Sequence, residues 1–268
     1  MPTIMQQQFL RSPRPAIKIE DVEIPKVLIG INSVLGWSHT SRGRDEWIRK
    51  YFTVDKIAEV FAAAVEMGVT GVLGPVYPKL HSAIRKTEEI TGQKITFVST
   101  TFGNIEDTAK QAKELKDFGS PICCLHGGWT DRWQVKDGKL PGLDECLKKI
   151  RDAGLIPGAA THNGEKLKLM DEGDYDISVF VTPVNKSGFY MNPSQEIALD
   201  AVNNCSKPVI AIKPLASGRF DENRIKEWLK WTFDVKGVSA MVIGFMSPEE
   251  VREDIEAVKE ILKVKRDA

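Results

Sequence analysis

Residues 238–262, VSAMVIGFMSPEEVREDIEAVKEIL, contain one complete strand-and-helix unit. The first seven residues form an apolar run of strand length, and apolar residues then recur at three- and four-residue spacing, which gives a helix one apolar stripe. The residues of this stripe are Val251, Ile255, Val258 and Leu262. Between the two elements, Ser247 can cap the helix, Pro248 suits its first position, and Glu250 can complete a capping box. The stretch therefore predicts a strand followed closely by a helix.

The same unit recurs along the chain. Seven further apolar runs of strand length lie at residues 27–32, 69–74, 95–100, 122–126, 155–160, 177–182 and 208–213. Helical patterns separate them. Eight alternations of about 30 residues each match an α/β fold, the (β/α)8 or TIM barrel. A doubly wound open sheet is the alternative. We expect a single (β/α)8 barrel domain over residues 1–268, with a short hairpin around residues 16–31 at the bottom of the barrel and a polar tail over residues 1–16.

Composition limits the classes of partner. The chain has 268 residues, of which 42% are hydrophobic, so it can bury the core of one barrel. Its 37 basic and 37 acidic residues balance, so no long-range field favours nucleic acid or an anionic membrane. No apolar run approaches the roughly 20 residues that span a bilayer, and the N-terminus shows no signal-peptide core. The four cysteines lack paired spacing. We expect a cytoplasmic protein with a small-molecule substrate; the sequence leaves the oligomeric state open.

His126 is the first candidate site residue. In a (β/α)8 barrel the reactive groups lie where strands end and the following loops begin, and His126 closes the run 122–126. Side chains alternate along a strand, so Ile122 and Cys124 should share its face toward the barrel interior. A histidine there can orient or protonate a substrate oxygen. The alternative is a histidine bonded only to loop backbone.

Lys213 ends the run 208–213 in the same way. Alternation predicts that it shares a face with Val209 and Ala211, while Ile210 and Ile212 face the helices. A lysine in a barrel mouth can anchor an anion, or act as a Schiff-base nucleophile if its pKa is depressed. The alternative is a structural pair or a wall of a coenzyme site.

Two long loops follow predicted strands. Residues 36–50, GWSHTSRGRDEWIRK, are rich in hydroxyl and basic groups that could bind a carboxylate or phosphate. Residues 126–142 carry Trp129 and Trp133, which could line a substrate wall. Each loop could equally be a solvated connection held down by its tryptophans.

Several stretches, taken in order, resemble the aldo-keto reductases from end to end. VEIPKVLIGIN (22–32) is similar to the opening hairpin and first strand of that family, and ICCLHGGW (122–129) to the fourth strand, which delivers the catalytic histidine. AGLIPGAATHNGEKL (153–167) is similar to the strand-five segment that contacts the nicotinamide amide. VIAIKPLASGRF (209–220) and VIGFMSPEEVRED (242–254) resemble the last two strands and their coenzyme-phosphate loops.

The resemblance implies hydride transfer from a nicotinamide coenzyme to a small carbonyl metabolite. His126, with Tyr77 and Lys213 as further candidates, would then carry the catalytic chemistry, and Asn185 could assist. The implied coenzyme contacts are Thr161, His162 and Asn163 for the nicotinamide, and Ser217, Gly218, Gly244 and Ser247 for the phosphates.

The catalytic positions depart from the family pattern. The family's proton-donating tyrosine is tuned by a lysine paired to an aspartate, whereas Leu73 occupies the aspartate position and Thr100 or Thr101 the lysine position. Tyr77 falls near the tyrosine position but not squarely on it. A phenol without a neighbouring cation keeps a pKa of about 10, which makes it a poorly tuned acid at neutral pH. We therefore expect non-standard catalytic residues.

The coenzyme and metal expectations are also weak. Gly244 and Glu250 occupy positions where NADP-preferring members often place basic residues, so NAD(P) binding is predicted to be weak and the cofactor is unknown. His39, His126 and His162 belong to loops at the mouth but show no ligand spacing, so we expect less than about one tightly bound transition metal per chain.

Three functional hypotheses follow. The first is a reductase-like enzyme acting on a small carbonyl or oxygenated metabolite. The second is a lyase, isomerase or metal-assisted hydrolase in which Lys213 or the histidines replace the missing groups. The third is a non-catalytic ligand-binding barrel.

Overall fold

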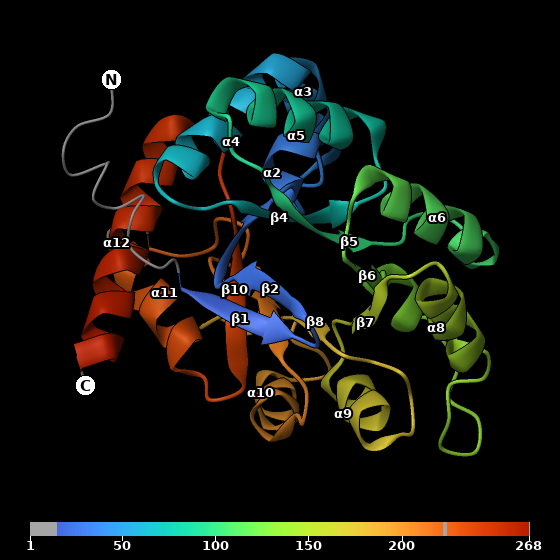
Figure 1. Ribbon diagram of the computed structural model, residues 1–268. Coiled ribbons are helices and arrows are strands. Elements are labelled where there is room, and N and C mark those ends of the chain that lie inside the picture. Colours follow the sequence, from blue (N-terminus) through green and yellow to red (C-terminus); the bar gives the residue numbers. More distant parts are fainter. Residues whose placement is uncertain (1–14, 222–223, 268) are drawn as a thin grey trace.

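Eight parallel strands close into a barrel in the computed structural model, which describes residues 15–221 and 224–267 (Figure 1). The strand order is β10-β3-β4-β5-β6-β7-β8-β9, so each strand pairs with its neighbour in sequence and β10 closes on β3. The barrel strands are β3 (Val27–Gly30), β4 (Gly71–Pro75), β5 (Thr96–Thr100), β6 (Ile122–Leu125), β7 (Ile156–Ala160), β8 (Phe180–Pro183), β9 (Val209–Ile212) and β10 (Val238–Gly244). This confirms the predicted fold and excludes the open sheet.

Helices surround the barrel and connect consecutive strands (Figure 1). The α-helices are α2 (Asn32–Leu35), α3 (Arg42–Tyr51), α4 (Val54–Glu66), α5 (Pro78–Thr91), α6 (Thr108–Phe118), α7 (Gly127–Thr130), α8 (Leu143–Asp152), α9 (Gly164–Glu172), α10 (Gln195–Asn204), α11 (Ile225–Asp234) and α12 (Pro248–Asp267), and one 3-10 turn, η1, spans Ile105–Asp107. Within the described residues, no helix is long and apolar enough to cross a membrane.

A hairpin lies across one end of the barrel (Figure 1). Its strands, β1 (Ala16–Ile19) and β2 (Val22–Pro25), are antiparallel and lead into the start of β3. Ile19 and Ile24 are fully buried against the residues that fill the barrel interior. The predicted hairpin is confirmed, although Ala16 already belongs to it rather than to the tail. Residues 1–14 lie outside the described residues.

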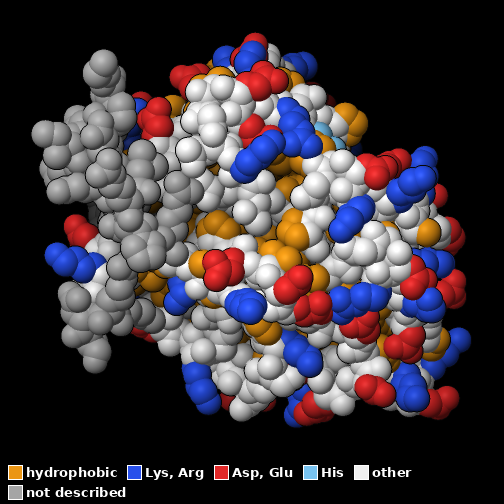
Figure 2. Space-filling model, in the orientation of Figure 1, with side chains coloured by type: hydrophobic (Ala, Val, Ile, Leu, Met, Phe, Trp, Pro, Cys, Tyr) orange, Lys and Arg blue, Asp and Glu red, His pale blue; other side chains and the backbone are white. Residues whose placement is uncertain are grey.

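The side of the molecule that carries the hairpin shows basic and acidic side chains interspersed (Figure 2). No large patch of one sign is visible on the part of this face that is drawn in colour. This pattern agrees with the balanced charge of the sequence.

Alternation along β6 follows the prediction. Ile122 and Cys124 join the cluster inside the barrel, whereas Cys123 and Leu125 pack in the layer between strands and helices. His126, the next residue with the inward parity, therefore continues toward the mouth.

The alternation predicted for β9 is wrong. Ile210 and Ile212 pack inside the barrel, while Val209 and Ala211 face the helix layer. Strict alternation would then turn Lys213 outward, but its φ of 57° is in the left-handed region, so the chain leaves the strand at this residue. The left-handed conformation is what allows its side chain to reach the mouth.

Candidate active site

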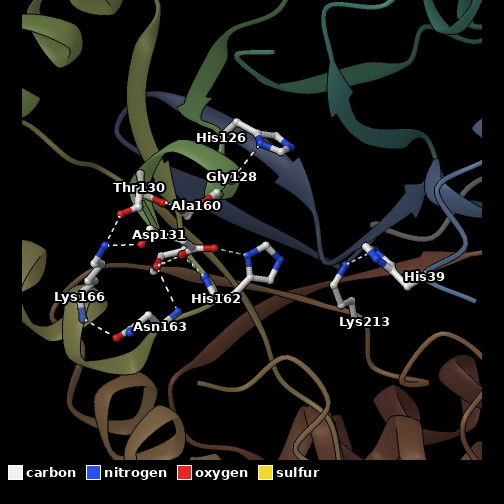
Figure 3. Close-up of polar contacts among 12 residues, drawn as sticks. His39, His126, Gly128, Thr130, Asp131, Ala160, His162, Asn163, Lys166 and Lys213 are labelled. Carbon is white, nitrogen blue, oxygen red and sulfur yellow. Dashed lines mark hydrogen bonds and ion pairs between the residues drawn. The ribbon is translucent and has the colours of Figure 1, made fainter. Parts of the chain in front are cut away.

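The mouth is the end of the barrel at which the eight parallel strands finish. Its polar groups come from the ends of three strands and from three loops. His126, His162 and Lys213 follow β6, β7 and β9. Asp131, His39 and Tyr190 come from the loops after β6, β3 and β8. Figure 3 shows the His162 ring between Asp131 on one side and the Lys213 and His39 pair on the other.

Asp131 holds His162 in place. One carboxylate oxygen of Asp131 lies 2.7 Å from Nδ1 of His162, and the other accepts hydrogen bonds from the His162 backbone N–H at 2.9 Å and from the Thr161 hydroxyl at 2.7 Å. Burial tends to raise the pKa of Asp131, but these hydrogen bonds from His162 and Thr161 outweigh it, so the pKa is lowered. The carboxylate therefore stays ionised and can only accept.

The tautomer of His162 follows from this contact. Because ionised Asp131 accepts, Nδ1 of His162 carries the proton, and Nε2 of the neutral ring is left as an acceptor. An imidazole oriented by a carboxylate in this way is the arrangement of a general base.

His126 has the opposite tautomer. Its Nδ1 accepts a hydrogen bond from the backbone N–H of Gly128 at 3.1 Å, so Nε2 carries the proton and is a donor. Its backbone N–H is held by the Thr101 hydroxyl at 3.0 Å. Burial lowers the pKa of His126, so the ring is neutral at neutral pH. The mouth thus has one neutral imidazole that donates and one that accepts.

Two glycines make room for these two rings. A Cβ on Gly127 would lie 2.9 Å from Cε1 and 3.0 Å from Nδ1 of His162. A Cβ on Gly128 would lie 3.1 Å from Nδ1 of His126. The sequence His-Gly-Gly at the start of α7 therefore accommodates one imidazole at each glycine.

Lys213 contacts a second group of mouth residues. Its Nζ lies 2.9 Å from Nε2 of His39 and 5.2 Å from the centre of the Tyr190 ring. The Tyr190 ring also lies 5.0 Å from the His39 ring and 5.3 Å from the His162 ring, measured between centres. Burial lowers the pKa of Lys213 to about 8, and burial followed by the charge of Lys213 lowers that of His39 to about 4. His39 is therefore neutral and accepts from Lys213.

Tyr77 and Asn185 are placed differently from one another. Tyr77 precedes α5 and packs edge-on against Trp37 and Phe102, with ring centres 5.5 Å and 6.5 Å away. Its hydroxyl makes no hydrogen bond within the part of the chain that the structure describes. Asn185 is fully buried and bonds the backbone of Phe189, so it shapes the loop that carries Tyr190. Its contacts are those of a loop-shaping residue.

Comparison with known proteins gives a likeness in fold. No model of a known protein family matches the chain, and no curated protein matches it in sequence. Solved structures do match it. A Pseudomonas aeruginosa protein described as an aldo-keto reductase matches with a TM-score of 0.64 at 13% identity, over 96% of this chain and 99% of its own.

Two further structures agree. The holo form of an aldo-keto reductase from Bacillus halodurans gives a TM-score of 0.61 at 12% identity, covering 92% of this chain and 91% of its own. An aldo-keto reductase from Brucella melitensis gives a TM-score of 0.61 at 15% identity, covering 91% of this chain and 92% of its own. The chain has the aldo-keto reductase fold. At these identities the likeness extends to the fold alone.

An aldo-keto reductase fold raises the question of a nicotinamide coenzyme, and the residues expected at the nicotinamide are already engaged. The Thr161 hydroxyl is buried, donates to Asp131, and accepts from the Asn163 backbone N–H at 3.1 Å. The Asn163 side-chain oxygen caps α9 by accepting from the Lys166 N–H at 3.0 Å. His162 is bonded to Asp131. These groups do not fit a free amide-binding pair.

The predicted phosphate loops fit no better. Ser217 and Gly218 lie in an exposed turn after β9, and Gly244 is exposed at the end of β10. At α12 the predicted cap is confirmed, because Ser247 accepts from the Glu250 N–H at 3.2 Å, but the Glu250 carboxylate reaches one residue further back than in a capping box and accepts from the Met246 N–H at 2.7 Å. A carboxylate therefore takes the place at this helix start that a phosphate would need. Arg252 pairs with Glu249 at 3.2 Å.

We expect NADPH to bind this chain only weakly. Charge-assisted contacts to a 2′-phosphate contribute about 1.5 to 3 kcal/mol each, and losing two of them predicts roughly 10²- to 10⁴-fold weaker binding than in an ordinary member of the family. Titration followed by energy transfer from the six tryptophans should give a Kd no better than about the high micromolar range. Submicromolar binding would contradict this prediction.

Two site residues were not singled out from the sequence as functional. Asp131 lies in a loop 31 positions before His162, and Tyr190 lies in the loop after β8. An aspartate five residues after His126, in the loop that follows β6, was a weak signal for the first, but its pairing with the histidine that follows β7 requires the three-dimensional structure. In the described part of the chain, no group of three or more histidine, cysteine or acidic side chains could hold a metal ion.

Proposed function

We propose that this chain is an enzyme that moves a proton at the carbon next to the carbonyl group of a small metabolite, as an isomerase or lyase does. The observation that supports this is the pair of mouth histidines with opposite fixed tautomers. His162 presents an acceptor Nε2 and His126 a donor Nε2–H. Abstraction of such a proton needs both a base at carbon and a hydrogen-bond donor at the carbonyl oxygen.

Each group has a defined part in the reaction. His162 takes the proton through Nε2, and the ionised Asp131 stabilises the imidazolium that forms. His126 donates its Nε2 hydrogen bond to the carbonyl oxygen, where negative charge develops. A neutral imidazole suits this task because its single proton, on Nε2, stays on the ring at neutral pH and is available as a hydrogen-bond donor. General acid–base catalysis of this kind contributes about 10²- to 10⁴-fold.

Hydride transfer is the second candidate. The fold and the apolar wall of Trp37, Tyr77 and Phe102 beside His126 favour it. The engaged Thr161 and Asn163 and the acidic start of α12 weigh against it. The site therefore supports proton transfer better than an ordinary reductase reaction.

Deuterium exchange tests this proposal. Hydroxyacetone, pyruvate and dihydroxyacetone phosphate are incubated with the protein in D2O, and loss of the α-hydrogen signal is followed by proton NMR. We expect exchange of at least one compound, and a loss of about 10²-fold or more in His162→Gln.

His81→Gln is the matched control, because His81 is the one histidine of the chain outside the mouth and stacks on Phe118 in the helix layer. This variant should exchange like wild type. Equal exchange by His162→Gln, or no exchange of any compound by wild type, would contradict the proposal. NADPH-dependent consumption of the same compounds would favour the reductase instead.

A further inference from the structure

Lys213 has an unusual environment for a lysine. Its side chain is half-buried in the mouth, and its Nζ contacts a neutral imidazole, His39, and the face of Tyr190. Within residues 15–221 and 224–267, no carboxylate forms an ion pair with it, and burial alone accounts for its pKa of about 8. Buried lysines are normally paired, so this amine is neither neutralised by an anion nor fully solvated.

The backbone around Lys213 is strained in a way that serves this placement. Lys213, His39 and Tyr190 have φ values of 57°, 57° and 61°, in the left-handed region that costs non-glycine residues roughly 1 kcal/mol or more. The three side chains contact one another although they come from the segments that follow three different strands, β3, β8 and β9. In Lys213 the left-handed turn is what brings the amine to the barrel mouth instead of the helix layer. Three of the seven non-glycine residues with positive φ in the described part of the chain thus meet at this one point of the mouth.

The contacts also leave the amine chemically competent. His39 accepts through Nε2, which already faces the Asn32 amide nitrogen at 3.2 Å, so His39 can hold the Lys213 amine without neutralising it. Lys166, another lysine close to the mouth, is different, because its Nζ donates to the backbone carbonyls of Thr130, Asp131 and Trp133. Of these two lysines, Lys213 is the one whose nitrogen can be released to react.

We propose that Lys213 binds the carbonyl carbon of a small ketone or aldehyde substrate as a Schiff base. The proposal rests on the proposed function and adds a covalent step to it. The unprotonated Nζ attacks the carbonyl carbon, a C–N bond forms, and one proton passes from the nitrogen to the carbonyl oxygen, which gives a neutral carbinolamine. The C–O bond then breaks as the hydroxyl takes a second proton from solvent and leaves as water, and the lone pair of nitrogen forms the C=N bond of a protonated Schiff base. His126 holds the departing oxygen through its Nε2–H hydrogen bond and keeps its own proton.

The two histidines keep compatible parts in this scheme. The iminium draws electrons from the adjacent carbon as the carbonyl did, but more strongly, because it carries a full positive charge. His162 then removes the α-proton, and hydrolysis by water returns the free lysine and the product. Tyr190, which touches His39, His162 and Lys213, lies against the place where the substrate would be held.

Reductive trapping tests the covalent step. Wild-type protein is incubated with hydroxyacetone, pyruvate or dihydroxyacetone phosphate, reduced with sodium borohydride, and analysed by intact mass and peptide mapping. Borohydride adds a hydride to the iminium carbon, so the expected mass increase equals that of the carbonyl compound less one oxygen atom. The label should lie on Lys213, and its yield should rise as the pH passes about 8 rather than near the ordinary lysine value of about 10.4.

Variants separate this role from an anion-binding role. Lys213→Arg keeps the positive charge but cannot form the Schiff base, so it should lose both the label and the exchange. Lys259→Arg is the matched control, because burial also lowers the pKa of Lys259, which lies on α12 and faces Met67 at the end of α4. It should behave like wild type in both assays.

The outcomes are distinct. Absence of label on Lys213 with His162-dependent exchange intact would overturn the Schiff base and leave the proposed function standing. Wild-type exchange by Lys213→Arg would do the same and assign Lys213 to anion binding. Absence of both label and exchange in wild type would remove both proposals. Peptide mapping of the wild-type protein shows whether Lys213 carries the label, so the Schiff base is tested even if Lys213→Arg does not fold.

Discussion

Replacing Asp131 with Asn should reduce α-proton exchange by about 10²- to 10⁴-fold without unfolding the protein. Asn has the size of Asp but carries an amide that can donate. If that donor faces Nδ1 of His162, the imidazole must accept there, and its proton moves to Nε2. The ring would then present a donor to the mouth instead of an acceptor, so the base is lost although every atom stays near its place. The initial rate of deuterium incorporation measures the effect.

The tautomer itself can be observed. Nitrogen-15 NMR of the imidazoles should show His162 protonated at Nδ1 in wild type and at Nε2 in Asp131→Asn, with His126 unchanged. Thr161→Val is the matched control, because it removes one hydrogen bond to the same carboxylate without altering the charge that selects the tautomer. Equal losses of exchange in both variants would mean that Asp131 acts only by packing, and would contradict the assignment of His162 as base.

The barrel could be predicted because its signals are local and repeated. Each strand is an apolar run, the longer helices show an apolar stripe, and several helices begin at a capping side chain, such as Thr53 at α4, Ser194 at α10 and Ser247 at α12. The direction in which a side chain points at a strand end could not be predicted equally well. His126 continues the alternation of β6, whereas Lys213 leaves β9 through a left-handed residue, a conformation that nothing in the sequence IAIKPL marks.

In the candidate site, too, the positions of residues could be predicted from the sequence, whereas their contacts could not. Strand-end position was enough to place His126, His162 and Lys213 at one end of the barrel. It could not show that Thr161 and Asn163 are engaged in internal hydrogen bonds, since their partners, Asp131 and the start of α9, are fixed only when the loops fold. Nor could it select the tautomers, which depend on one backbone N–H and one carboxylate.

Gly127→Ala should lower α-proton exchange by about 10²-fold while the fold survives. Gly127 begins α7, and its φ is not in the left-handed region, so alanine fits the backbone there. The new methyl would lie 2.9 Å from the His162 ring, which cannot retreat without lengthening its 2.7 Å bond to Asp131. Overpacking of this kind costs about 1 to 3 kcal/mol, so a modest fall in Tm should accompany the loss of exchange.

A double-mutant cycle distinguishes displacement of the base from a general disturbance of the mouth. If Gly127→Ala acts by moving His162 away from Asp131, it should reduce exchange little in the Asp131→Asn variant, where the base is already lost. The loss of exchange in the double variant, expressed as a free energy, should then be well below the sum of the two single losses. Gly43→Ala is the control, because a Cβ at Gly43 in α3 meets nothing within 4 Å and should leave exchange unchanged. Additive losses would show that the methyl acts elsewhere, whereas strong coupling would place the effect of Gly127 on the contact between His162 and Asp131.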